Sequence, residues 1–304
     1  MKHLGLKTLL MALLLTFVFV ACEETTTPND PKPKPNAPKN LVASSIDSSS
    51  IKLKWTASDS TASTLFSGYV IEITPGSWQP VSITGNQTTA VITGLDEGTV
   101  YTFNIFAKYS NGEESASSAS VSWSPATRFI KNINDDFIKV YEYASLLGSG
   151  LDLYDPANGK PRTLTVATSG DWNLGLDTRT DGEIWFGSPT EIGYSWTGGT
   201  PPDVFVSNQF YPADAIEDVY DSEALDAIKH SYSLQLAELV SVDLQGKSGL
   251  VMVVRLKEGN SSNFTYAKVF IKKSALGWLQ GFIPNRYIEA EVSYQRVPGV
   301  PYAF

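Results

Sequence analysis

Apolar and polar residues alternate in several short runs between residues 39 and 126. In one of these runs Ile51, Leu53 and Trp55 are separated by lysines, which makes one face apolar and the other charged. Alternation with a period of two is typical of β-strands that bury one face. Runs of this kind recur as far as Trp123, and their spacing predicts that residues 39–126 form a β-sandwich.

Particular residues in this segment resemble the pattern of the fibronectin type III family. Leu95 and Tyr101 are similar to the family's corner between two sheets, where the tyrosine hydroxyl bonds back to the backbone. The resemblance implies a spacer or an adhesive platform more often than a catalyst. The chain contains no Arg-Gly-Asp sequence, so integrin-type adhesion is not supported. The other residues that carry the resemblance are Pro38, Leu41, Trp55 and Tyr69.

Residues 127–304 are also rich in alternating runs. Apolar residues occupy every second position on both sides of Asp181-Gly182, and this dipeptide is a strong signal for a β-hairpin turn. The apolar run at 250–256, interrupted only by Arg255, predicts a buried central strand, because a strand covered on both faces is apolar along most of its length.

One patch of the C-terminal segment has a different period. Over residues 212–232 the apolar spacing is that of a helix, with Pro212 at its first position. The predicted fold class is therefore mainly all-β. It combines a fibronectin type III β-sandwich at 39–126 with a β-rich, ligand-binding domain at 127–304 that has one short helical region.

The amino end has the pattern of an export signal. Two lysines precede an apolar stretch at 8–20, which is too short to span a bilayer. The stretch ends in Phe-Val-Ala-Cys at 19–22, which resembles the lipobox of bacterial lipoproteins, although that family usually has leucine where Phe19 stands. The resemblance implies that residues 1–21 are a signal peptide and that Cys22 is lipidated. The alternative is an ordinary signal peptide followed by an incidental cysteine.

The residues that follow Cys22 favour the cell surface. Glu23 and Glu24 are similar to the acidic export signal of surface-exposed lipoproteins in some Gram-negative bacteria. Residues 22–38 are predicted to be a proline-rich stalk, because the prolines at 28–38 exclude helix and favour extended chain, with a reach of roughly 40 Å over residues 25–38. We therefore expect a bacterial cell-envelope protein, lipid-anchored through Cys22 in the outer membrane and exposed at the surface.

Composition excludes several kinds of partner. The 304 residues include 23 Lys and Arg against 32 Asp and Glu, and the resulting net charge of −9 disfavours nucleic acid. Cys22 is the only cysteine, so the chain has no internal disulfide and no cysteine-based metal site. Loss of residues 1–21 leaves His230 as the only histidine, which removes multi-histidine metal sites. We therefore predict no metal and no cofactor.

Three aromatic residues are the candidates for ligand binding. Trp185, Tyr194 and Trp196 lie among glycines, and aromatic rings beside glycine-rich loops can form flat platforms for sugar rings. Such residues are more often the core of short strands, with the glycines in turns. The predicted partner is a glycan or a protein, bound without catalysis.

A carboxylate-dependent glycan hydrolase is the alternative from the enzyme class. Its catalytic pair would come from Asp171, Asp177, Asp181 and Glu183. A hairpin turn with exposed strand edges accounts for these carboxylates more simply. No Gly-x-Ser-x-Gly elbow occurs, which argues against a serine hydrolase. We predict that the protein is not an enzyme and has no catalytic residues.

The C-terminal domain also resembles HmuY-like haemophore lipoproteins. The resemblance rests on Trp-Asn-Leu-Gly-Leu at 172–176 and Tyr-Ala-Lys-Val at 266–269, with Asn173 in place of the family's usual acidic residue. It implies a β-rich fold and, as a further alternative, a haem or tetrapyrrole carrier. Axial haem ligands are scarce, because the mature chain offers only His230 and Met252. The resemblance therefore implies a fold and no haem site.

Overall fold

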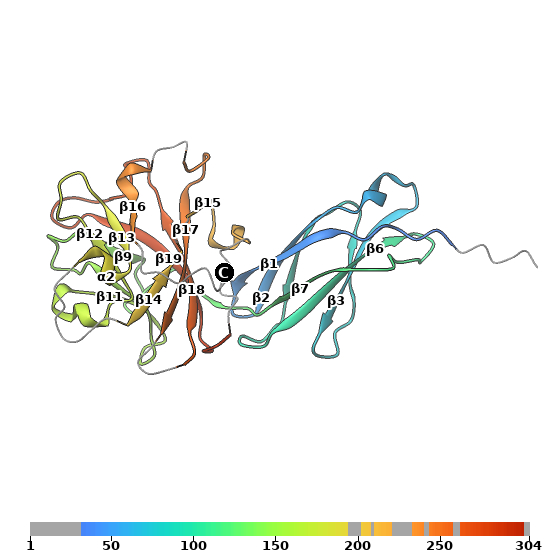
Figure 1. The fold of residues 1–304 in the computed structure, drawn as a ribbon, viewed down its shortest axis with the longest axis horizontal. Helices are drawn as coiled ribbons and strands as arrows, with labels where there is room; N and C mark the ends of the chain where they lie inside the picture. Colours follow the sequence, from blue (N-terminus) through green and yellow to red (C-terminus); the bar gives the residue numbers. More distant parts are fainter. Residues whose placement is uncertain are drawn as a thin grey trace, which may run out of the picture. The chain divides into compact units, whose positions relative to one another are not determined.

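The computed structural model describes residues 32–193, 202–207, 210–220, 233–239, 243–257 and 262–300. β-Strands predominate in them, which confirms the predicted mainly all-β fold (Figure 1). Pro35–Phe304 form one compact unit. We call residues 35–126 the N-terminal lobe and residues 127–300 the C-terminal lobe. The predicted signal peptide, Cys22 and most of the predicted stalk lie outside the described residues.

The N-terminal lobe is a sandwich of two antiparallel sheets. One sheet has the strand order β1-β2-β5 and the other the order β4-β3-β6-β7. The alternating sequence produces this arrangement, since every second residue of β6 is buried. The elements are β1 (Lys39–Asp47), β2 (Ser50–Thr56), the 3₁₀ helix η1 (Asp59–Ala62), β3 (Phe66–Thr74), β4 (Val81–Thr84), β5 (Thr89–Thr93), β6 (Tyr101–Tyr109) and β7 (Ala119–Trp123).

Aromatic residues fill the space between these two sheets. Trp55 of β2 and Tyr69 of β3 are buried, and their rings meet edge to face with centroids 5.3 Å apart. The Tyr101 hydroxyl accepts a hydrogen bond of 3.1 Å from the backbone N–H of Asp96, which confirms the predicted tyrosine corner. This bond ties the start of β6 to the loop before it and fixes the crossover between the sheets.

The C-terminal lobe contains two larger sheets. One has the order β11-β10-β12-β13-β16, and the other runs β14-β17-β18-β19-β8, with β15 paired to β17 and β9 to β19. The strands of the first sheet are β10 (Gly150–Asp155), β11 (Lys160–Leu164), β12 (Leu174–Asp177), β13 (Trp185–Gly187) and β16 (Ser233–Gln235). Those of the second are β8 (Thr127–Phe129), β9 (Ile138–Tyr141), β14 (Asp203–Val206), β15 (Tyr211–Ala213), β17 (Gly249–Lys257), β18 (Thr265–Lys272) and β19 (Tyr287–Gln295).

Short helices connect these strands. They are η2 (Val166–Asp171), α2 (Pro189–Ile192), η3 (Ile216–Asp218) and η4 (Leu236–Glu238). The main core lies between the two sheets, where apolar side chains of β10, β12 and β13 cluster with those of β17, β18 and β19. The other face of β17 is covered as well, since Val251 packs with Ile216 and Val219, and Val253 with Ala126. Burial of both faces explains why β17 is apolar along almost its whole length.

The predicted hairpin and central strand are both present. β12 and β13 pair antiparallel on either side of the Asp181-Gly182 turn, with Leu176 opposite Phe186. β17 lies between β14 and β18, and its residues are mostly buried. Turn chemistry and burial therefore predicted both elements correctly.

The helix expected at 212–232 does not begin at Pro212, so that prediction was wrong. Pro212 is the middle residue of β15 and lies opposite Leu250 of β17. Apolar residues three positions apart pack against β17 and β18: Ala213, Ile216 and Val219. A three-residue spacing fits the 3₁₀ turn of η3 as well as an α-helix, which explains the error. Residues 221–232 lie outside the described residues.

Candidate functional site

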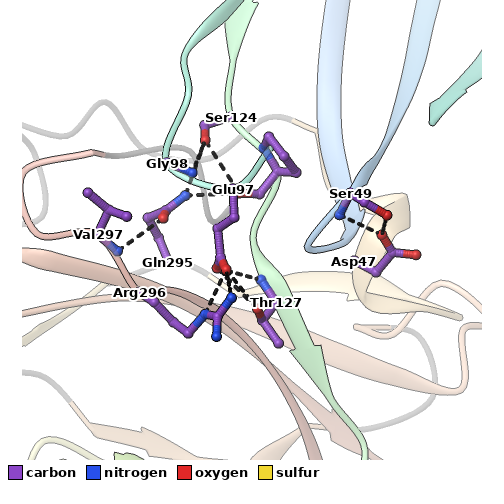
Figure 2. Close-up of polar contacts among 10 residues, drawn as sticks. Asp47, Ser49, Glu97, Gly98, Ser124, Thr127, Gln295, Arg296 and Val297 are labelled. Atoms are coloured by element: carbon purple, nitrogen blue, oxygen red, sulfur yellow. Dashed lines mark hydrogen bonds and ion pairs between the residues drawn. The ribbon is translucent and has the colours of Figure 1, made fainter. Parts of the chain in front are cut away.

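Polar contacts around Glu97 join the two lobes. The Glu97 side chain is 8% exposed and accepts hydrogen bonds from the backbone N–H of Thr127 at 3.0 Å and from the Thr127 hydroxyl at 3.1 Å. Arg296, which follows β19, donates to it from Nε at 2.6 Å and also from Nη2 (Figure 2). Since β8 begins at Thr127 and pairs with β19, Glu97 holds the corner of the N-terminal lobe against both strands.

A second set of contacts crosses the junction at Lys268 of β18. This lysine is fully buried, and its Nζ donates to Ser44 Oγ of β1 at 2.9 Å and to the carbonyl oxygen of Val219 at 3.2 Å. Burial away from water disfavours the charged amino group and lowers the pKa of Lys268 to about 7. One side chain therefore binds both lobes at once.

A groove opens between the lobes where Val219 lies. It has a cavity volume of about 700 Å³. The N-terminal lobe contributes residues of β1 and β2, and the C-terminal lobe contributes β15 and the segment around η3. The described residues that line it are Asn40, Val42, Lys54, Trp55, Thr56, Tyr211, Pro212, Asp218, Val219 and Tyr220.

Tyr220 gives the groove a distinctive chemistry. The amino groups of Lys52 and Lys54 lie 5.9 and 5.4 Å from the centroid of its ring. Burial raises the pKa of the Tyr220 hydroxyl, so the phenol is neutral at physiological pH. Lys52 also donates a hydrogen bond of 2.8 Å to Asp218, and this bond raises the pKa of Lys52. The groove thus offers an aromatic ring beside paired charges.

The described lining of the groove contains one carboxylate. That carboxylate belongs to Asp218, which is bound to Lys52. Hydrolysis of a glycosidic bond ordinarily requires two carboxyl groups on opposite sides of the bond. The described lining therefore lacks the pair of carboxyl groups that such hydrolysis uses.

Trp185 lies elsewhere, on β13, and is half-buried. Its Nε1 donates a hydrogen bond of 2.7 Å to Glu183, and its ring packs against the cluster of Leu164, Trp172 and Ile192. These contacts match the interpretation of Trp185 as part of the packing of short strands. The other two candidates, Tyr194 and Trp196, lie outside the described residues, so the proposed aromatic platform stays a prediction.

The four candidate carboxylates occupy different surroundings. Asp171 is exposed at the end of η2, whereas Asp177 accepts hydrogen bonds from Arg179 Nε at 3.0 Å and Nη2 at 2.9 Å. Asp181 and Glu183 line a cavity of about 170 Å³ at the β12–β13 turn. The structure therefore brings two of the four to one small cavity and pairs a third with arginine.

Two residues that the resemblance to haemophores brought forward, Met252 and Asn173, lie in the described part of the chain, and both contribute to packing or to strand pairing. Met252 of β17 is 1% exposed and belongs to the main core. Asn173 accepts a hydrogen bond of 2.8 Å at Oδ1 from the backbone N–H of Leu153, which ties it to β10. In the described part of the chain, no group of three or more His, Cys, Asp or Glu side chains is placed to hold a metal ion. His230 lies outside the described residues.

The groove residues were missed by the sequence analysis. Lys54 was recognised only as an outward-facing residue, and Tyr211 and Tyr220 were not singled out. Outward-facing lysines on a strand of a sandwich are normally solvated, and no local pattern links β2 to a segment more than 150 residues later. Only the long-range fold reveals the site.

The comparison with family models settles the nature of the N-terminal lobe. The fibronectin type III domain model matches residues 36–123. This segment is a fibronectin type III domain. The match agrees with the sandwich and with the Tyr101 corner, and it confirms the resemblance carried by Trp55, Tyr69 and Leu95.

Relatives of very different kinds share this domain-sized similarity. Chitinase A1 of Niallia circulans is 39% identical over 103 residues, which is 34% of this chain and 14% of the chitinase. Chitinase Chi52 of Paenibacillus xylanexedens is 40% identical over 100 residues, covering 33% of this chain and 17% of its own. Receptor-type tyrosine-protein phosphatase eta of Gallus gallus is 31% identical over 105 residues, 34% of this chain and 7% of the phosphatase.

The chain thus spans less than a fifth of the length of each of these relatives. Their activities belong to those proteins, since the similarity extends over about a third of this chain. Among the described residues of this chain, none of the helices has the length and apolar character required to cross a membrane.

Proposed function

We propose that the protein is a non-catalytic lipoprotein of the bacterial cell surface that binds carbohydrate in the groove between its lobes. The observation that carries the proposal is the pair of tyrosines, Tyr211 and Tyr220, at one cavity with Asn40, Thr56 and Asp218. Tyrosine rings stack on the apolar faces of sugar rings, and amide, hydroxyl and carboxylate groups form hydrogen bonds with sugar hydroxyls.

The size of the groove and the way it is built support this proposal. Its volume of about 700 Å³ is typical of small-molecule sites. Glu97 and Lys268 each bond to both lobes, so the two walls are held together before a ligand arrives. A preformed site loses less conformational entropy on binding than one that must assemble.

The chitinases suggest which carbohydrate to test first. Two relatives of the fibronectin type III domain bear that name, which makes a chitin-like polysaccharide the first candidate ligand. The similarity supports a class of ligand and carries no implication of catalysis, because it covers about a third of this chain.

Affinity electrophoresis in gels that contain glycol chitin, β-glucan or xylan tests the binding site. We expect Tyr220→Ala and Tyr211→Ala each to weaken retention about three- to tenfold, the loss of one stacking contact. Tyr143→Ala removes an exposed tyrosine outside the groove lining and serves as the control. Unchanged migration of both groove variants in a gel that retains the wild type would refute the groove as the site.

The same gels decide between the groove and the aromatic candidates from the sequence. Combined replacement of Trp185, Tyr194 and Trp196 by Ala should leave retention intact if the groove binds the polysaccharide. Loss of retention in this triple variant, with normal retention of Tyr220→Ala, would place the site on the aromatic platform. Circular dichroism of each variant separates loss of binding from loss of fold.

We also propose that Cys22 anchors the protein to the outer membrane. Acyl chains on this residue would hold the chain durably, because each buried CH₂ contributes about 0.8 kcal/mol. Cys22→Ser is expected to move the protein from the membrane fraction to the soluble fraction. Surface exposure predicts digestion of the wild-type protein when intact cells are treated with protease, and full protection would contradict it.

One observation keeps a hydrolase as the second candidate. Asp181 and Glu183 line the same small cavity, together with Arg286. Incubation of the protein with a panel of glycans should release no product if the protein only binds. Product release that Asp181→Asn or Glu183→Gln abolishes would establish the hydrolase and remove the non-catalytic assignment.

A further inference from the structure

Two loops of the C-terminal lobe expose large apolar side chains to solvent. Leu146 and Leu147, between β9 and β10, are 92% and 52% exposed, and Phe282 and Ile283, between β18 and β19, are 89% and 74% exposed. We call these four side chains the apolar tips. Single exposed leucines are ordinary, but a cluster of large apolar groups marks a surface that meets an apolar environment.

Hydrogen bonds hold the two loops beside each other. Ser145 Oγ donates to Asn285 Oδ1 at 2.7 Å. At the base of the loops, Arg286 Nη2 and the backbone N–H of Arg286 donate to the Glu142 carboxylate at 2.7 and 2.9 Å. The Glu142 side chain is 5% exposed and the Arg286 side chain 38%, so the carboxylate of this ion pair is buried at the base of the loops. The four apolar side chains therefore form one surface from two loops.

Beyond the Glu142–Arg286 pair at their base, the stretches of the two loops that bear the apolar tips carry no charge. Residues 143–149 and 274–285 contain no Asp, Glu, Lys, Arg or His, in a chain of which 18% of the residues are charged. Moving a charged side chain into hydrocarbon costs free energy. Insertion of these two stretches would bring no charged side chain into the bilayer.

We propose that the apolar tips insert into the surface of a lipid bilayer. Four such side chains offer a few hundred Å², which is well below the roughly 800 Å² that each partner buries in a stable protein interface. A bilayer has no such requirement, because binding to it grows with each apolar group that enters. The insertion depends neither on the carbohydrate groove nor on lipidation of Cys22.

The loops are also ordered in advance of any contact. The backbone N–H of Tyr141 donates to the carbonyl oxygen of Gly148 at 2.9 Å, and that of Asn285 to the carbonyl oxygen of Phe282 at 2.8 Å. Both turns are therefore closed within the protein itself. Insertion then costs little additional backbone entropy, which favours even a small contact.

Fluorescence of single-cysteine variants tests the insertion directly. Residues 23–304 retain the compact unit from Pro35 onward and contain no cysteine, so L146C, F282C and V91C each accept one environment-sensitive fluorophore. Val91 is 54% exposed on β5 of the other lobe and is the matched control. With phosphatidylcholine vesicles, alone or with phosphatidylglycerol, the labels at 146 and 282 should shift to shorter wavelength and be quenched by bilayer-located quenchers.

Flotation with the same vesicles provides a second measurement. The combined L146S/L147S/F282S/I283S variant should bind at least about fivefold less than the unlabelled parent, whereas V91S should bind equally. The proposal is overturned if the labels at 146 and 282 do not shift, or if the label at 91 shifts as much. It is also overturned if the shifts occur without vesicles and grow with protein concentration, since a second copy of the chain then covers the tips.

Discussion

Lys268 is an amino group held in the interior by two neutral oxygens, those of Ser44 and Val219. Other charges act on it from a distance: Glu217 and Asp218 near η3 favour its protonation, and Arg128 of β8 opposes it. Desolvation outweighs them and lowers its pKa to about 7, against roughly 10.4 in an unfolded chain. Between these two values the unfolded state binds more protons than the native state, so stability must rise with pH.

Replacement of Lys268 by a residue that does not titrate measures how much this lysine contributes to the pH dependence of stability. We expect the free energy of unfolding of the wild type, relative to Lys268→Met, to increase by about 2 kcal/mol between pH 7 and pH 9. Methionine is of similar length and does not titrate, so the contributions of groups that do not interact with Lys268 cancel in the difference. Urea denaturation at pH 7, 8 and 9 measures it. Parallel stability profiles of the two proteins would mean that the pKa of Lys268 is not depressed.

For single residues, the sequence predicts the structural role only where that role depends on neighbours close in the chain. The Tyr101 hydroxyl was placed correctly because its acceptor role follows from a corner only a few residues long. Lys268 was noticed only as part of a late strand. Its environment comes from Ser44 and Val219, which lie far from it in the chain, and no spacing rule brings them together.

Two glycines determine how β10 and β12 pack. Gly150 and Gly175 lie opposite each other in the pairing of these strands. The ring of Trp172 covers them, and a Cβ added at Gly150 would lie 2.1 Å from Trp172 Cε2. Trp172 is fully buried and donates from Nε1 to the carbonyl oxygen of Thr165 at 3.1 Å, so the ring cannot move away freely. The absence of a side chain on both strands is what admits the indole.

A methyl group at Gly150 should therefore be costly. We expect Gly150→Ala to reduce the free energy of unfolding by about 2 kcal/mol, the usual effect of overpacking a core. Trp172→Leu removes the ring that the methyl group meets, so the double variant should lose less stability than the sum of the two single variants. Chemical denaturation of all four proteins completes the cycle. If the losses of stability in the two single variants simply add in the double variant, the added methyl group is accommodated by a shift of the strands and not by the Trp172 ring.

Elements with strong turn chemistry were predicted well, and those set by tertiary packing were not. The β12–β13 hairpin follows from Asp181-Gly182, which demands a tight turn whatever surrounds it. Pro212 was expected to open a helix but lies in β15, where pairing with β17 overrides the local preference. Proline has no backbone N–H to donate. This suits a strand with a single partner strand as well as it suits the first position of a helix.

The fibronectin type III domain and the mainly β fold could be predicted from the sequence, but the surface between the two lobes could not. Alternating runs were enough to identify the fibronectin type III domain, since its strands follow one another along the chain. The groove is lined by β1 and β2 together with residues 211–220, and its existence depends on how the lobes are joined. That junction includes the side-chain contacts of Glu97 with Thr127 and Arg296 and those of Lys268, which carry no signature in sequence.

Glu97 should therefore decide whether the two lobes unfold together. In Glu97→Ala, Thr127 loses the acceptor for its N–H and hydroxyl, and Arg296 loses its charged partner. We expect calorimetry to resolve two transitions where the wild type shows one, since each lobe has its own core. A cycle with Arg296→Gln should give a coupling energy of about 1–3 kcal/mol. A single transition at the wild-type temperature in Glu97→Ala would show that the remaining contacts between the lobes are sufficient, among them those of Lys268 with Ser44, Lys52 with Asp218 and Gln295 with Pro125. The combined variant Lys268→Met/Glu97→Ala would then test whether the groove keeps its form, with the effect of Tyr220→Ala on polysaccharide retention as the readout.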